Sequence, residues 1–169
     1  MASGPAATKG AATVSGTALV SYTGKQPVGY TLDKVPAGWK VLHVDAGALT
    51  LAPEDFVLPE GVVPGQAAPA GSDQESVSWE GMIVVMQSDA ASFPKDVPTD
   101  KITVGGLPGV IAQMKDGNGG DGARTLFVEQ PSGAYLTIQV WKGLGWSNDQ
   151  ITEFGSGVHV TKSATVSVG

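Results

Sequence analysis

Glycine and proline occur at short intervals throughout this chain. Its 169 residues include 24 glycines and 11 prolines. Both residue types favour turns, because glycine accepts positive φ angles and proline restricts φ to a narrow range. Between the turns, apolar residues mostly recur with the two-residue period of β-strands. This pattern predicts short strands joined by tight connections, in a chain long enough for one domain with a sizeable core.

The second half of the chain contains the clearest strand pairs. Residues 102–115 predict two strands around a Gly-Gly turn, and residues 116–122 (DGNGGDG) carry the strongest hairpin signal. Residues 124–130 and 134–142 predict a further antiparallel pair around Pro-Ser-Gly. Residues 77–87 are apolar at both odd and even positions, which predicts a central strand covered on both faces.

The first half is less regular. Residues 13–23 alternate, with Val20 and Tyr22 on the more apolar side, which predicts a half-buried strand. A sharp corner or hairpin is expected at residues 36–38, and a long Pro/Gly-rich loop at residues 53–76. We expect residues 1–12 to be a flexible spacer and residues 13–169 to form a single β-rich domain.

One short helix is expected at residues 147–154. Ser147 as the N-cap and Gln150 three residues later form a capping box. The other expected features are a hydrophobic staple of Trp146 and Ile151, a buried stripe of Ile151 and Phe154, and a left-handed C-cap at Gly155 or Gly157.

The strands and the helix together predict an α+β fold, a mostly antiparallel curved sheet of about seven to ten strands with one short C-terminal helix. A β-sandwich is the alternative.

Charge and cysteine content exclude several functions. The net charge is −6, so the chain lacks the basic surface that nucleic acid requires. Cysteine is absent, which rules out disulfides, thiolate catalysis and cysteine-based zinc sites. No apolar run is long enough to span a membrane. We expect contact with a membrane only through an N-terminal anchor that this chain lacks.

No metal, cofactor or catalytic site is predicted. His43 and His159 lie far apart, and each is expected to be a strand residue with its ring at the surface. Residues 116–122 resemble a calcium loop, but Asp121 falls where that loop needs glycine and Phe127 where it needs glutamate. The acidic pairs Glu54/Asp55 and Asp73/Glu75 lie in the predicted loop, where solvent exposure does not favour general acid catalysis.

The one candidate binding surface is a row on the strand at residues 134–142. Leu136, Ile138 and Val140 share the apolar side of this strand and are expected to face the core. The row on the other side is Tyr135, Gln139 and Trp141. Exposed aromatic rings flanked by an amide are suited to sugar or peptide ligands. Alternatively, a second layer of the protein covers this row.

The order of three segments resembles a known family. ITVGGLPGVIAQM, RTLFVEQPSGAYLTIQV and LGWSNDQITEFGSGVHV follow one another within residues 102–160. They resemble the C-terminal half of the extracytoplasmic domains of anti-sigma-factor-like proteins and lipoproteins in Gram-positive bacteria, especially actinobacteria. GYTLDKVPAGW resembles the opening often found upstream in such domains. The resemblance implies an extracytoplasmic domain with no catalytic residues.

From these observations we expect a non-enzymatic extracytoplasmic binding or sensing module, tethered to the cell envelope. Its partner would be a small ligand, a glycan or a protein. The alternatives are a carbohydrate-binding β-module and a cell-wall hydrolase. An exposed, coplanar Trp and Tyr row would favour the carbohydrate-binding module, and a buried pair of carboxylates in a cleft would favour the hydrolase.

Overall fold

The computed structural model describes residues 18–44, 48–58, 62, 81–89, 97–115, 121–141, 144–161 and 166–167. The predicted spacer at residues 1–12, most of the predicted loop at residues 53–76, and the tip of the hairpin at residues 116–120 lie outside these residues.

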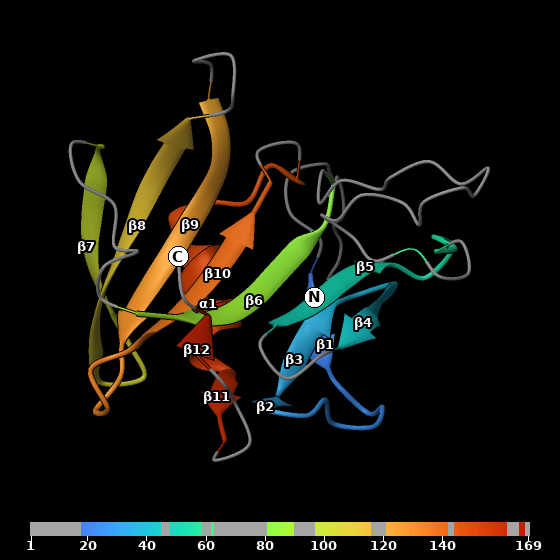
Figure 1. Ribbon diagram of the computed structural model, residues 1–169. Helices are drawn as coiled ribbons and strands as arrows, with labels where there is room; N and C mark the ends of the chain where they lie inside the picture. Colours follow the sequence, from blue (N-terminus) through green and yellow to red (C-terminus); the bar gives the residue numbers. More distant parts are fainter. Residues whose placement is uncertain are drawn as a thin grey trace, which may run out of the picture.

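An eight-stranded sheet organises the described chain (Figure 1). Seven of its strands form one antiparallel path, and β12 (Val166–Ser167) pairs parallel with β6. Figure 1 shows the strand direction turning steadily along this path, as expected of a twisted, curved sheet. The predicted α+β class, mostly antiparallel sheet with one short helix, is confirmed. The path runs β4 (Trp39–Val44), β5 (Ala48–Pro53), β6 (Ile83–Ser88), β10 (Tyr135–Val140), β9 (Asp121–Glu129), β8 (Leu107–Lys115) and β7 (Thr99–Val104).

The predicted hairpins occur where positive φ angles allow them. Gly105 and Gly106 have φ of 57° and 85° and join β7 to β8. Strands β9 and β10 pair antiparallel around Gly133, whose φ is 92°. Strands β8 and β9 also pair antiparallel, as the glycine-rich segment between them predicts. The expected central strand is confirmed at β6, since Ile83 and Val84, which face opposite sides of the sheet, are both fully buried.

Two small sheets flank the large one. β1 (Leu19–Ser21) pairs with β3 (Lys34–Pro36), and β2 (Tyr30–Leu32) pairs with β11 (Val158–Val160). Residues 36–38 form a corner and not a hairpin, because β3 pairs with β1 whereas β4 pairs with β5.

The predicted orientation of the first strand is wrong. Val20 is 43% exposed, whereas Leu19 and Tyr22 pack against the core. Strand β1 is only three residues long and ends at Ser21, so Tyr22 does not continue its alternation. The two-residue period therefore breaks where the strand ends.

The capping box of helix α1 (Asn148–Ser156) is confirmed. The Gln150 N–H donates to Ser147 Oγ at 3.3 Å, and the Ser147 N–H donates to Gln150 Oε1 at 3.0 Å. Of the two predicted C-cap positions, Gly157 is confirmed and Gly155 lies inside the helix. The predicted left-handed conformation is wrong, because Gly157 has φ of −95°. The Gly157 N–H donates to the Phe154 carbonyl, which satisfies the helix end without a left-handed residue.

Helix α1 covers one face of the sheet and completes the core. Ile151 and Phe154 are fully buried and belong to the same cluster as Leu126 and Ile138 of the sheet. Trp146 packs against Phe154, with ring centroids 5.8 Å apart and ring planes at 63°. The described residues include no helix with the length and apolar character needed to cross a membrane.

Ser147→Ala should lower the free energy of unfolding by about 1 kcal/mol, because it removes the oxygen that accepts the Gln150 N–H. Urea unfolding monitored by circular dichroism measures this loss. Ser21→Ala, an exposed substitution in β1, is the matched control and should change stability by less than about 0.5 kcal/mol. Equal midpoints for Ser147→Ala and the wild type would show that the cap does not stabilise α1.

Candidate functional site

Two residues of the predicted row lie on the sheet face opposite helix α1. Tyr135 pairs with Glu129 and Gln139 pairs with Thr125, whereas the neighbouring core residue Ile138 pairs with Leu126. Because successive side chains of a strand point to opposite faces, Tyr135 and Gln139 point away from α1, whereas Trp141 follows the last residue of β10 and the alternation does not place it.

The row does not form one continuous open surface. Thr137, which lies between Tyr135 and Gln139 on the same face, is only 4% exposed, and its hydroxyl lies 3.2 Å from Ser88 Oγ. Trp141 is half-buried. Its indole nitrogen is fully buried and has no hydrogen-bond partner in the part of the chain that the structure describes. Tyr135, at the start of β10, lines a hollow.

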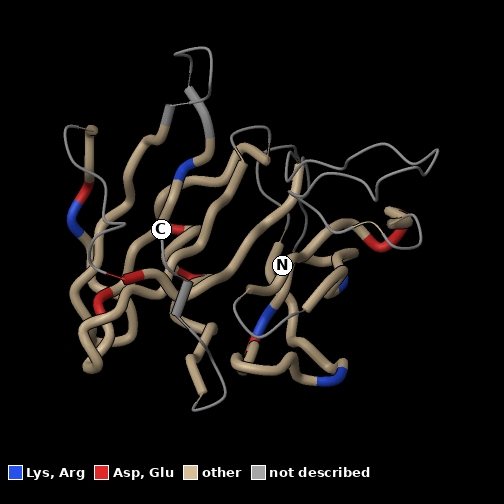
Figure 2. Tube along the Cα trace, viewed as in Figure 1, with Lys and Arg blue, Asp and Glu red and all other residues tan. Residues whose placement is uncertain are grey.

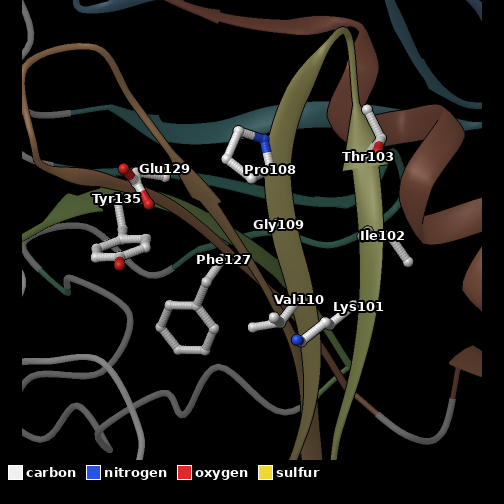
Figure 3. Close-up of a pocket in the computed structure, with 9 residues that line it drawn as sticks. All are labelled: Lys101, Ile102, Thr103, Pro108, Gly109, Val110, Phe127, Glu129 and Tyr135. Carbon is white, nitrogen blue, oxygen red and sulfur yellow. The ribbon is translucent and has the colours of Figure 1, made fainter.

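This hollow of about 360 Å³ lies at the β7 side of the sheet (Figure 3). Four neighbouring strands contribute to it, so its geometry is set by the sheet and not by loops. Its lining is Lys101, Ile102 and Thr103 of β7, Pro108, Gly109 and Val110 of β8, Phe127 and Glu129 of β9, and Tyr135 of β10.

Proline and glycine in β8 shape the floor of the hollow. Pro108 has no N–H to donate to β9, and the pairing of β8 with β9 begins at the next residue, Gly109. A Cβ at Gly109 would lie 2.8 Å from the Phe127 carbonyl oxygen, so the two strands approach closely at this point. The hollow therefore opens where the β8–β9 ladder ends.

An aromatic pair forms one wall. The rings of Phe127 and Tyr135 have centroids 6.5 Å apart and planes at 82°, an edge-to-face arrangement. Phe127 is 4% exposed and supports the half-buried Tyr135. The pair presents a ligand with a corner of two rings and not with the flat platform on which a sugar stacks.

Two opposite charges stand at different ends of the hollow. Figure 3 shows the Lys101 ammonium beside Val110, on the side facing Phe127, and the Glu129 carboxylate beside Tyr135. Both side chains belong to exposed residues, and neither makes an ion pair within the described residues. Charged residues are otherwise few and scattered along the described strands (Figure 2). The presence of two opposite charges in one largely apolar hollow is therefore unusual among the described strands of this sheet.

The two histidines lie in strands, as expected. His43 is half-buried in β4, and His159 is exposed in β11. His159 Nε2 lies 3.1 Å from Asp33 Oδ2, a pairing that the sequence did not reveal because 126 positions separate the residues. The described residues contain no group of three or more side chains placed to bind a metal ion.

Two further hollows are less suited to a specific ligand. One of about 220 Å³ lies near the end of α1 and includes Ser156 and His159, but the Ser156 hydroxyl donates to the Glu153 carbonyl. The other, of about 400 Å³, includes Tyr22 and Trp39 and is lined in large part by the segment around β1. The 360 Å³ hollow is smaller than the latter, yet its walls are paired strands of the main sheet.

Compared with protein-family models, curated proteins and solved structures, the chain has no match. The choice of this hollow as the candidate site therefore depends only on the geometry described above. Tyr135 was predicted from the sequence, whereas Lys101, Phe127 and Glu129, which belong to other strands, were not. The charges in these strands gave no clear signal: Asp100 and Lys101 are adjacent in β7, and Arg124 and Glu129 lie five residues apart in β9, so neither pair follows the two-residue period.

Proposed function

We propose that this chain is a non-enzymatic binding or sensing module of the cell envelope, and that the hollow bounded by β7, β8, β9 and β10 holds its ligand. The observation that carries the proposal is the combination of an apolar aromatic wall with two oppositely charged side chains on one rigid sheet face. Ligand sites are typically concave and apolar, with a few polar groups that orient the ligand.

The location in the envelope is supported by the sequence. Residues 102–160 resemble extracytoplasmic domains of anti-sigma-factor-like proteins and lipoproteins, and the Ala- and Gly-rich residues 1–12 have the composition of a tether. In this proposal the sheet domain stands outside the cytoplasm and is attached through its N-terminal side.

The charges of the hollow favour binding over hydrolysis. Glycoside hydrolysis commonly uses two carboxylates, one of which stays protonated through burial or a like-charged neighbour. Here the carboxylate of Glu129 faces solvent, and the second charge in the hollow is the ammonium of Lys101. Opposite charges of this kind can neutralise two charges of a bound ligand.

Titration with 8-anilinonaphthalene-1-sulfonate, an apolar aromatic anion, tests the site. We expect saturable binding to the wild type, with affinity at least about tenfold lower in Tyr135→Ser, which corresponds to about 1.4 kcal/mol. Val28→Ser is the control, because it removes a 59% exposed apolar side chain elsewhere. Circular dichroism establishes that both variants are folded. Equal affinity of Tyr135→Ser and the wild type would show that the dye does not bind in this hollow and would refute the proposed site.

A further inference from the structure

We infer that the hollow recognises a short, extended peptide of about three residues with free ends, its carboxylate at Lys101 and its ammonium at Glu129. This inference rests on the proposed function, since it names the ligand class of the same site. It follows from the separation of the two charges, the apolar lining between them, and the sign of each charge.

The register gives the separation. Lys101 pairs with Val110, and Val110 pairs with Phe127, so these three residues lie on one line across the sheet. Glu129 lies two residues further along β9. Two strand spacings and two residues along the strand place the Lys101 and Glu129 Cα atoms roughly 12 Å apart. An extended tripeptide spans about 10 Å between its ends, and the flexible lysine side chain can bridge the difference.

The lining between the charges is apolar. Val110 lies between Lys101 and Phe127, and Pro108 lies on the Glu129 side of the hollow. A central side chain of the peptide would pack in the corner formed by Phe127 and Tyr135, which are nearly perpendicular. Burial of this side chain contributes the apolar part of the affinity.

The sign of each charge favours a zwitterion over a single-headed ligand. A fatty acid would pair its carboxylate with Lys101 but would leave the Glu129 carboxylate at the other end of the hollow without a positive partner. A zwitterion compensates both charges, and because the hollow is open to solvent the remaining polar atoms of the peptide stay hydrated.

Calorimetric titration with the tripeptide Ala-Leu-Ala tests the inference. The free tripeptide should bind the wild type, and both N-acetylation and C-terminal amidation should lower its affinity at least about fivefold. In Lys101→Met, the amide should bind as well as the free acid. In Glu129→Gln, the acetylated peptide should bind as well as the free amine. Each variant thus loses its sensitivity to modification of one end of the peptide only, and this identifies the end that each residue contacts. A general loss of structure would not produce this pattern.

Two matched variants serve as controls. Lys25→Met and Glu54→Gln remove exposed charges outside this hollow and should leave the affinity for Ala-Leu-Ala within about twofold of the wild type. Equal effects of Lys25→Met and Lys101→Met would overturn the inference, since the peptide would then respond only to net charge.

The result with the dye separates this inference from the proposed function. If 8-anilinonaphthalene-1-sulfonate binds in a Tyr135-dependent way but Ala-Leu-Ala neither binds nor displaces it, the peptide inference is overturned and the hollow remains a ligand site. If octanoate displaces the dye, and this displacement requires Lys101 but not Glu129, the peptide inference is overturned and the ligand class is a single-headed amphiphile. If the dye does not bind in the hollow, the proposed function fails first.

Discussion

Phe154→Ala should lower the free energy of unfolding by about 3 to 5 kcal/mol, the largest stability effect that we expect from one side chain. Phe154 is fully buried, packs against Trp146 with ring centroids 5.8 Å apart, and joins α1 to the sheet. Its removal leaves a cavity that the rigid sheet cannot close. Urea unfolding measures the loss as a shift in midpoint at constant slope.

Two variants of the same helix act as controls for Phe154→Ala. Glu153→Ala breaks the exposed ion pair with Lys34 and should cost less than about 1 kcal/mol. Phe154→Leu keeps most of the apolar volume and should fall between Glu153→Ala and Phe154→Ala. If Phe154→Ala were no less stable than Glu153→Ala, α1 would not pack on the sheet as described.

Gly155→Ala should be destabilising although alanine favours helices. Replacing glycine by alanine inside a helix normally stabilises it by about 1 kcal/mol. Here the new Cβ would overlap Leu126 Cδ2 and lie 3.6 Å from Ile138 Cδ1. Overpacking of a rigid core costs about 1 to 3 kcal/mol, so we expect a net loss of stability in urea unfolding.

A double-mutant cycle isolates the overlap at Gly155. Leu126→Ala removes the atom that the new Cβ would meet, so in that background Gly155→Ala should be neutral or stabilising by up to about 1 kcal/mol. An equal loss in both backgrounds would refute the close contact between Gly155 and Leu126.

Local signals in the sequence predicted much of this fold. The Gly105-Gly106 turn requires positive φ at two adjacent residues, and the structure has it there. The Ser147 capping box uses residues three positions apart, so its hydrogen bonds depend on local geometry alone. Strands in residues 102–140 were predictable for the same reason, since turn chemistry and the two-residue period agree throughout that segment.

The candidate site was only partly predictable. Tyr135 could be placed on the face away from the core because Leu136, Ile138 and Val140 define the other face. Its neighbours Lys101 and Phe127 join it through pairing across β7, β8 and β9, and the sequence does not specify which residues meet across strands.

The sequence by itself determined the short antiparallel strands, the N-cap of α1 and the apolar face of β10, because each depends on residues within a few positions of one another. Only the tertiary structure decided which of the two candidate glycines caps α1, since Gly155 lies inside the helix against Leu126 and Gly157 is the C-cap. It also decided the assembly of Lys101, Glu129 and Tyr135 around one hollow. The physical reason is that close packing and strand register join distant segments, and no local pattern records the space left between them.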